Sequence, residues 1–263
     1  MPNACFAEND FMKFTSVAVI ILAAGKGSRM MSDLPKVVHE VHGRSMINRV
    51  LDCAVSLFDK KNIVVVIGHK WEQVKKNIDS AYSCQISYAL QKNLLGTADA
   101  VKCALPYLGD HIKHVLVLCG DVPLIRKETI ASFFDHYISN NQELSVLAVD
   151  VESPGGYGRI VVDETDNFLA IREEADATFE EKKIQTINAG VYFISKKFLV
   201  EALDLIGSDN VQQEYYLTDL VSISRNLRKK AGYFMGNNSA EVMGVNTVDE
   251  LRRVEHILES GDI

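Results

Sequence analysis

Dense basic runs are absent from this sequence of 263 residues. Its 28 lysines and arginines are outnumbered by 35 aspartates and glutamates, which gives a net charge of −7 at pH 7. Such a surface repels a polyanion, so nucleic acid is not an expected partner. A small anionic substrate stays open, because a few cations in one cleft act locally against the net charge.

Long apolar runs are also absent, since none approaches the roughly 20 residues of a membrane span. The run at 17–24 follows Lys13 and resembles the core of a signal peptide. However, Glu8 and Asp10 precede it, and a buried parallel strand gives an apolar run of the same length. We therefore interpret residues 17–22 as a strand and expect a cytoplasmic protein that does not interact with membranes.

Paired cysteines are missing as well. The five cysteines are Cys5, Cys53, Cys84, Cys103 and Cys119. They form no C-x-x-C pair, so they indicate neither a disulfide framework nor a zinc site. Two H-x-x-H pairs, His39/His42 and His111/His114, flank predicted strands, and we do not expect them to bind metal.

Strand-like and helix-like segments alternate in the first 150 residues. Apolar strand segments are predicted at 17–22, 63–67, 86–90, 114–119 and 144–149, and helices at 46–58, 71–78, 97–105 and 127–136. This alternation predicts βαβ units with helices on both faces of the sheet. The expected fold class is therefore α/β, with a Rossmann-like, mostly parallel mixed sheet flanked by helices.

The pattern changes after residue 150. Loop residues at 154–158 precede short strands predicted at 159–162, 168–171 and 190–194 and helices predicted at 196–206, 215–227 and 248–258. We expect one domain at 15–263, with a nucleotide lobe at about 15–150 and a smaller, β-rich substrate lobe at about 151–263. Residues 1–14 show no periodicity and are expected to form a disordered tail.

The strongest local signal is the string LAAGKGSRM at 22–30, followed by Pro35 and Lys36. It follows the first strand, so it lies at the edge where open α/β sheets bind ligands. Glycines let backbone N–H groups approach phosphate oxygens, while Arg29 and Lys36 supply positive charge. The string is not a Walker A loop, and Met30 at the last glycine position excludes a dinucleotide fingerprint.

Further motifs follow in order along the chain. They are Gln91 ahead of GTA at 96–98, GDVPLI at 120–125, GYGRI at 156–160, Glu173, INAG at 187–190, EYYLTD at 214–219 and GVN at 244–246. With the string at 22–30, they resemble the sugar-phosphate nucleotidyltransferase family from about residue 16 to 258. The resemblance is strongest to the N-terminal uridylyltransferase (UDP-N-acetylglucosamine pyrophosphorylase) domain of the bacterial bifunctional enzyme.

This resemblance implies the nucleotidyltransferase fold and a reaction. A uridylyl group would pass from UTP to N-acetylglucosamine-1-phosphate, with magnesium as cofactor and pyrophosphate as the second product. The substrates would be UTP and a sugar-1-phosphate, and the product would serve peptidoglycan and cell wall biogenesis. Such chemistry needs positioning and charge neutralisation more than a covalent nucleophile, which agrees with the absence of a Ser-His or Cys-His arrangement.

The resemblance also assigns roles to residues. Lys36 would contact the α-phosphate, Arg29 the departing pyrophosphate, and Asp121 and Asn246 would bind magnesium. The expected nucleotide-binding residues are Leu22, Ala23, Ala24, Gly25, Gln91, Gly96, Thr97 and Gly120, of which Gln91 and Gly96 would read the uracil edge. The expected sugar-binding residues are Gly158, Glu173 and Asn188.

Several positions depart from the family pattern. They are Leu94, Asp99, Cys119, Ala175 and Gln213. None belongs to the phosphate loop or the metal pair, so the same chemistry with another sugar-1-phosphate or NTP stays open. A catalytically silent nucleotide-binding module is disfavoured, because a binder has no need of a metal pair. No hexapeptide repeat follows, so we expect no C-terminal β-helix acetyltransferase domain, and the oligomeric state stays open.

Overall fold

The central sheet begins with the apolar segment after Ser16, in a computed structural model that describes residues 13–83 and 86–261. Strand β1 (Val17–Ala23) forms parallel ladders with β4 (Ile63–Ile67) on one side and β6 (His114–Cys119) on the other. Helices cover both faces of these strands, so each strand is apolar throughout instead of alternating. The predicted buried parallel strand at 17–22 is confirmed.

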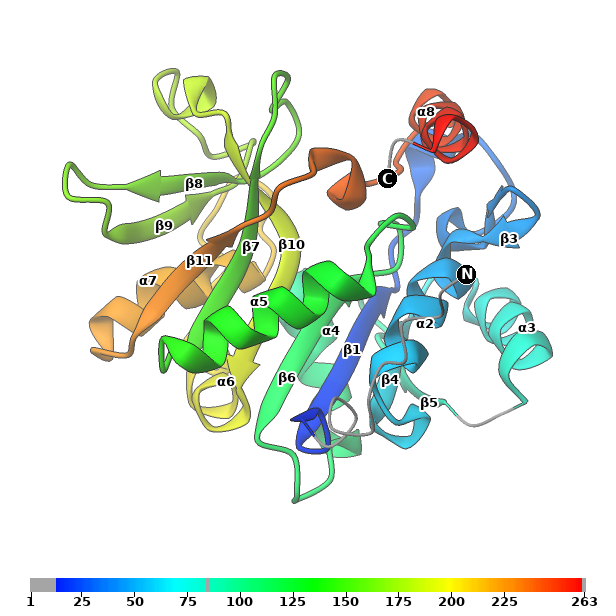
Figure 1. The fold of residues 1–263 in the computed structure, drawn as a ribbon, viewed down its shortest axis with the longest axis horizontal. Coiled ribbons are helices and arrows are strands. Elements are labelled where there is room, and N and C mark those ends of the chain that lie inside the picture. The colour runs from blue at the N-terminus through cyan, green and yellow to red at the C-terminus, as the bar shows by residue number, and fades with distance from the viewer. Residues whose placement is uncertain (1–12, 84–85, 262–263) are drawn as a thin grey trace, which may run out of the picture.

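The other strands extend the sheet on both sides. Their bounds are β5 Ser87–Leu90, β7 Leu144–Asp150, β8 Arg159–Val162, β9 Phe168–Arg172, β10 Thr186–Ser195 and β11 Ala231–Met235. The strand order is β11-β7-β10-β6-β1-β4-β5, and the β8–β9 hairpin joins through β10 (Figure 1). Only β10 runs antiparallel to its neighbours in this order. The sheet is therefore mixed and mostly parallel, as predicted.

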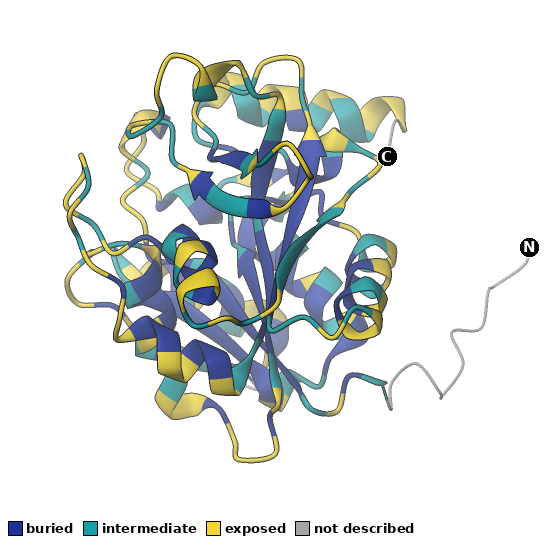
Figure 2. Cartoon of the chain, turned by 90° about the vertical axis from the view of Figure 1, so that its left-hand side faces the viewer, coloured by how far each residue is buried: buried dark blue, intermediate teal, exposed yellow. Residues whose placement is uncertain are grey.

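Helices cover both faces of the sheet. Their bounds are α2 Met46–Leu57, α3 Trp71–Tyr82, α4 Thr97–Ala104, α5 Lys127–Ser139, α6 Lys196–Leu203, α7 Leu220–Asn226 and α8 Val248–Ser260. Val19 and Ile21 of β1 pack in the core shared with α2, α3 and α5, while Ile20 packs in the core shared with α4, α6 and α7. Figure 2 shows the strands as the buried centre between these two layers.

A third, smaller core links α8 to the loop after β1. Met30 of that loop, Val245 ahead of α8, and Val254 within α8 are buried together in it. Met30 follows Arg29, and Val245 precedes Asn246. This core therefore anchors the neighbours of two residues that the sequence predicts for the functional site.

The predicted helix at 215–227 is wrong for its first residues. Tyr215 is extended, because its N–H donates to the Leu95 carbonyl at 2.8 Å and its own carbonyl accepts from the Ala98 N–H at 2.9 Å. A 3-10 turn at Leu217–Asp219 follows, and α7 begins only at Leu220. Backbone bonding to a distant loop replaces the helical pattern here. Strand β11 and the small hairpin of β2 (Glu40–Val41) and β3 (Arg44–Ser45) were not predicted.

The two expected lobes share one sheet. Strand β10, from the second lobe, lies between β6 and β7 of the first. The described residues include the end of the expected tail, where Phe14 is 4% exposed and its ring lies 4.9 Å from that of Phe58. Residues 1–12 of that prediction lie outside the described residues.

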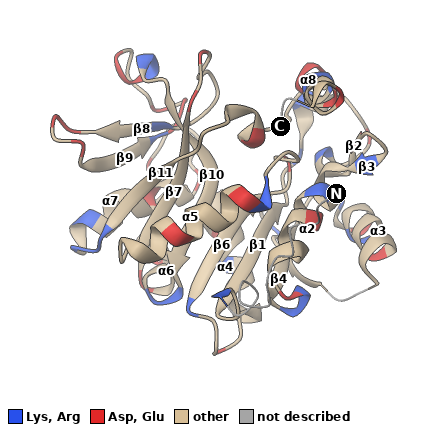
Figure 3. Cartoon of the chain, in the orientation of Figure 1, with Lys and Arg blue, Asp and Glu red and all other residues tan. Residues whose placement is uncertain are grey.

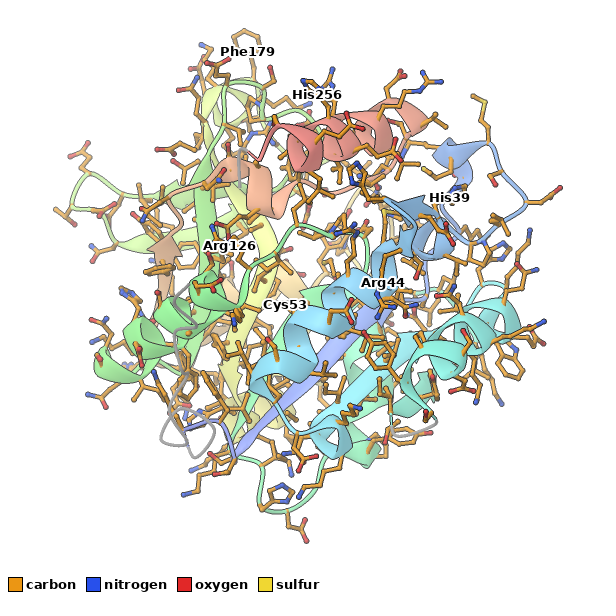
Figure 4. The ribbon with its side chains drawn as sticks, turned by 45° about the vertical axis from the view of Figure 1, so that its right-hand side comes forward. His39, Arg44, Cys53, Arg126, Phe179 and His256 are labelled. Atoms are coloured by element: carbon orange, nitrogen blue, oxygen red, sulfur yellow. The ribbon has the colours of Figure 1, made fainter. Side chains whose placement is uncertain are left out.

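Basic and acidic segments are interspersed in the view of Figure 3. Cys103, Cys119 and Cys53, which lies on α2 (Figure 4), are free, whereas Cys5 and Cys84 lie outside the described residues. Burial raises the pKa of the Cys53 thiol to about 12. Within the described ranges, no helix has both the length and the apolar character that crossing a bilayer requires.

Candidate active site

A cavity of about 500 Å³ opens at the carboxyl ends of β1 and β6, where open α/β sheets bind ligands. Most residues predicted for the site line it. These are Leu22, Ala23, Ala24, Gly25, Arg29, Lys36, Gln91, Gly96, Thr97, Asp121 and Asn246. The two cations expected at the phosphates and the two oxygen ligands expected for the metal therefore share one cavity.

Gly27 shapes the loop that follows β1. Its φ of +62° is left-handed, and a Cβ here would come within 2.4 Å of the Lys36 Cβ. Only glycine fits this conformation and this approach, so the loop folds back against Lys36. Met30 beside Arg29 is 2% exposed and Val37 beside Lys36 is 6% exposed. Buried neighbours therefore position both cations at the cavity wall.

Lys36 connects this loop to the far end of the chain. Its ammonium forms an ion pair with Asp121 and donates a hydrogen bond to Asn246 Oδ1 at 2.9 Å. The Lys36 and Asp121 side chains are 14% and 20% exposed. Partial burial limits solvent screening, so this pair interacts more strongly than an exposed one. Two side-chain oxygens from distant segments thus converge on one cationic group.

Backbone contacts hold these two oxygens side by side. The Val245 N–H donates to the Asp121 carbonyl at 2.9 Å. The Asn246 N–H donates to Glu250 Oε2 at 2.7 Å, and Thr247 and Glu250 form a capping box at the start of α8. The beginning of α8 therefore fixes Asn246 next to Asp121 through protein contacts alone.

The paired oxygens suit a hard divalent cation. Magnesium keeps several waters and binds substrate phosphates, so one or two protein ligands suffice. Asp121 and Asn246 provide two converging oxygen donors of that kind. Over 13–83 and 86–261, no group of three or more His, Cys, Asp or Glu is placed to hold a metal ion. Of the histidine pairs, His114 instead contacts the Tyr137 hydroxyl at 3.0 Å, and burial lowers the His114 pKa.

Gln91 and Gly96 also line the cavity. Gln91 is 4% exposed, and its Nε2 donates to the Gly96 carbonyl at 3.0 Å and to Asp99 Oδ2 at 2.8 Å. Gly96 has a φ of +119°, and a Cβ there would come within 2.5 Å of the Tyr215 carbonyl oxygen. Glycine is therefore required where this loop packs against the EYYLTD segment.

Thr97 has a structural contact in addition to its place at the cavity wall. Its hydroxyl oxygen accepts from the Leu217 N–H at 2.9 Å. Glu214, the first residue of the EYYLTD segment, also lines the cavity. So do Leu94 and Cys119, two of the positions that depart from the family pattern. These three residues were not predicted as site residues. The EYYLTD motif was the only signal in the sequence that pointed to Glu214.

Gly158, Glu173 and Asn188 lie outside the cavity wall but close to one another. The Asn188 N–H donates to the Gly158 carbonyl at 2.8 Å, and a Cβ on Gly158 would lie 3.5 Å from Glu173 Oε2. Glu173 accepts from Thr218 Oγ1 at 3.0 Å, and burial raises its pKa. A half-buried carboxylate with a hydroxyl neighbour is thus available beside a glycine.

The Asn188 side chain already has partners at both ends. Its Nδ2 donates to the Tyr192 hydroxyl at 2.7 Å, and its Oδ1 accepts from the Gly190 N–H at 2.9 Å. One amide hydrogen is left for a ligand. Asn188 therefore holds the irregularity in β10 between Asn188 and Tyr192 as well as any substrate it contacts.

Cys119 lies between the cavity and the Glu173 cluster. It lines the cavity, and its Sγ donates to the Gly190 carbonyl at 3.5 Å. Burial raises the pKa of the Cys119 thiol to about 12, and the charges of Asp121 and Glu173 add to that rise. The thiol is therefore neutral at ordinary pH, and Cys119 is a packing residue between the two groups.

Gly120 has a packing role in the structure. Its N–H donates to the Leu22 carbonyl at 2.9 Å, and a Cβ would come within 2.9 Å of Ile47 Cδ1. It is not among the residues of the cavity wall. Glycine at this position allows β6 to end directly against β1 and α2.

Comparisons with known proteins give a family model and sequence relatives. A family model described as Nucleotidyl transferase matches residues 18–253. The "Bifunctional protein GlmU" of Clostridioides difficile (strain 630) is 44% identical over 239 residues, which cover 91% of this chain and 51% of that protein. The "Probable UDP-N-acetylglucosamine pyrophosphorylase" of Acanthamoeba polyphaga mimivirus is 37% identical over 244 residues, covering 91% of this chain and 95% of that protein. The chain thus spans about half the length of its GlmU relatives.

A solved structure shares the fold. It is a Bacillus anthracis protein described as "a Putative Glucose-1-Phosphate Thymidylyltransferase" in complex with a sucrose. The TM-score is 0.69 at 19% identity, and the alignment covers 92% of this chain and 94% of that one. At this level of identity the likeness concerns the fold alone, and it agrees with the mixed sheet and its two helical layers.

Proposed function

The chain belongs to the nucleotidyl transferase family, and from this membership we propose that it transfers the uridylyl group of UTP to N-acetylglucosamine-1-phosphate. An oxygen of the sugar phosphate forms a bond to the α-phosphorus of UTP. The bond from that phosphorus to the bridging oxygen breaks, and pyrophosphate leaves with the electron pair. The products are UDP-N-acetylglucosamine and pyrophosphate. The mimivirus relative, described as a "Probable UDP-N-acetylglucosamine pyrophosphorylase", supports this choice of donor and acceptor.

One observation carries the proposal. Lys36, Asp121 and Asn246 converge at the wall of the cavity that also contains Arg29. Transfer of a nucleotidyl group depends on positioning and on neutralising phosphate charge. In the proposed site, Lys36 neutralises the α-phosphate and the exposed Arg29 stabilises the departing pyrophosphate. The Gly27 loop brings both cations to the same bound triphosphate.

Asp121 and Asn246 would hold a magnesium ion, as their converging oxygens suggest. The ion would neutralise phosphate charge and orient the triphosphate. Lys36 contacts both oxygens, so its ammonium would shift away from them when the ion binds. Glu250 and Thr247 keep Asn246 in place during that change.

The remaining site residues select the substrates in this proposal. Gln91 and Gly96 contact the uracil ring at one end of the cavity. Glu173 accepts hydrogen bonds from sugar hydroxyls, Gly158 leaves room for the sugar ring, and Asn188 contributes its remaining N–H. Cys119 separates the two halves of the substrate-binding region without taking part in the chemistry.

A second donor or acceptor with the same chemistry is the nearest alternative. The observation that favours it is that Leu94 and Cys119, both departures from the family pattern, line the cavity. Pyrophosphate release should be measured with four NTPs against several sugar-1-phosphates in magnesium. We expect the fastest pyrophosphate release with UTP and N-acetylglucosamine-1-phosphate. Faster release with another NTP and sugar-1-phosphate would support the alternative. UTP binding by calorimetry with no release from any pair would instead identify a silent nucleotide-binding module.

A further inference from the structure

The Nε2 end of the Gln91 side-chain amide donates hydrogen bonds to two oxygens. A glutamine amide has two N–H donors on Nε2 and acceptor lone pairs on Oε1. Both neighbours of Nε2, the Gly96 carbonyl at 3.0 Å and Asp99 Oδ2 at 2.8 Å, are oxygen acceptors. Both donors of Gln91 are therefore used within the protein.

The reverse orientation of this amide is disfavoured by the same two neighbours. It would place Oε1 against a carbonyl oxygen and a carboxylate oxygen at hydrogen-bond distance. It would also remove a charge-assisted hydrogen bond from a side chain that is 4% exposed. The backbone of Gln91 is fixed too, because its N–H donates to the Ile67 carbonyl at 2.8 Å. Asp99 therefore determines which end of the amide remains available.

Gln91 lines the cavity, and what it has left to offer a ligand is an acceptor. Uracil carries an N–H at ring position 3, which donates to such an acceptor. Cytosine carries a lone pair at the same position, which is repelled by it. A buried polar group that is mismatched in this way discriminates strongly between ligands.

We propose that Asp99 is a positioning residue that sets donor specificity, by holding the Gln91 amide so that its oxygen selects a base with an N3–H. This inference rests on the proposed nucleotide site. Asp99 does so from the first turn of α4, where the helix dipole stabilises a carboxylate. Its contact with Gln91 spans eight positions of the chain and crosses the Gly96 turn.

The test is the ratio of kcat/KM for UTP to that for CTP, measured by pyrophosphate release with N-acetylglucosamine-1-phosphate. In Asp99→Asn, the new amide can donate or accept, so it no longer forces one orientation on Gln91. We expect the ratio to fall by about 10-fold or more, the usual effect of losing a charge-assisted hydrogen bond. Both kcat/KM values are measured on the same enzyme preparation, so a change in the fraction of active enzyme cancels in their ratio. Asp99→Ser serves as a second variant if Asp99→Asn fails to fold.

A double-mutant cycle separates positioning from a general structural effect. Gln91→Ala removes the acceptor and should lower the ratio by itself, and Asp99→Asn should then cause no further fall. The control is Asp204→Asn, which breaks the ion pair with Lys102 of α4 at 2.6 Å but leaves Gln91 untouched. An unchanged ratio in Asp99→Asn, or an equal fall in the Gln91→Ala background, would overturn the inference.

Calorimetric titration distinguishes this inference from the proposed function. UTP and CTP are titrated in magnesium without any sugar phosphate. If no sugar supports turnover but UTP still binds more tightly than CTP in an Asp99-dependent way, the proposed acceptor is wrong and the inference stands. If turnover is found but CTP binds as well as UTP, the inference is wrong and the proposed chemistry stands.

Discussion

Lys36 and Asn246 are joined by a hydrogen bond of 2.9 Å, although 210 positions separate them in the chain. Lys36 lies in a 3-10 turn after β1, and Asn246 lies immediately before α8. The chain between them builds the rest of the sheet before it returns to the start. The site therefore exists only in the folded molecule. Each of its residues can be replaced singly, and the stability of each variant can be measured alongside its activity.

Replacement of Lys36 by alanine should lower turnover by about 10²–10³-fold, the typical effect of losing an electrostatic stabiliser of the transition state. The melting temperature should change little, because Lys36 and Asp121 both line the open cavity, where water can solvate the carboxylate that loses its partner. Pyrophosphate release gives the first quantity and thermal unfolding the second. Lys61→Ala, at a side chain that is 72% exposed, is the control and should leave both unchanged. Wild-type turnover in Lys36→Ala would contradict the role assigned to this residue.

Asp121→Ala should also lower turnover by about 10²–10³-fold and should raise the magnesium concentration needed for half-maximal rate. The reason is the loss of one of two converging oxygens, which leaves Asn246 alone. Removal of magnesium by a chelator should stop pyrophosphate release, and excess magnesium should restore it. Asp110→Ala, at an exposed position outside the cavity wall, is the control. A variant at Asp121 with an ordinary magnesium requirement would argue against this assignment.

Glu173 should make sugar binding depend on pH. Burial raises its pKa above the ordinary value of 4.5, and nearby Asp176, Asp219 and Glu214 add to the rise. Its ionised form, which accepts hydrogen bonds from sugar hydroxyls, is present above that raised pKa and is lost as pH falls through it. The KM for N-acetylglucosamine-1-phosphate should therefore begin to rise on acidification at a pH above 4.5, while the KM for UTP stays flat.

The matching substitution is Glu173→Gln. It should raise the sugar KM by about 10-fold, as expected for a lost charge-assisted hydrogen bond, and should remove this pH dependence. Glu180→Gln, at a side chain that is 78% exposed, is the control. The idea fails if the pH profile of the sugar KM is the same in Glu173→Gln and in the wild type.

The fold could be predicted where burial leaves a clear pattern. Strand β1 is covered on both faces, so it appears in the sequence as a continuous apolar run. Strand β11 could not be predicted, because it is an edge strand, is only partly buried and contains Gly232. The helix predicted from residue 215 was wrong for a tertiary reason, since the Tyr215 backbone bonds to a loop more than a hundred positions away.

The candidate site could be predicted as a set of residues but not as a set of contacts. Resemblance to a family pointed to Gln91, yet nothing in the sequence indicated that its two donors are taken by Gly96 and Asp99. Gly120 was expected at the nucleotide, but the motif did not reveal that a Cβ at this position would meet Ile47 of α2 and the backbone of β1. Hydrogen-bond partners follow from the packed structure, and a motif specifies only which residues take part.

Gln213 is the departure whose physical effect is clearest. It has a φ of +56°, a left-handed conformation that costs a residue with a Cβ about 1–2 kcal/mol. Gln213→Gly should relieve that strain, and the greater freedom of glycine in the unfolded chain should offset part of the gain. We expect the free energy of unfolding to rise by about 0.5–1 kcal/mol, measured by urea denaturation. Gln213→Ala removes the same side chain but keeps a Cβ, so it should give no gain. Equal stabilisation by alanine and glycine would show that backbone strain at this position is not the cause.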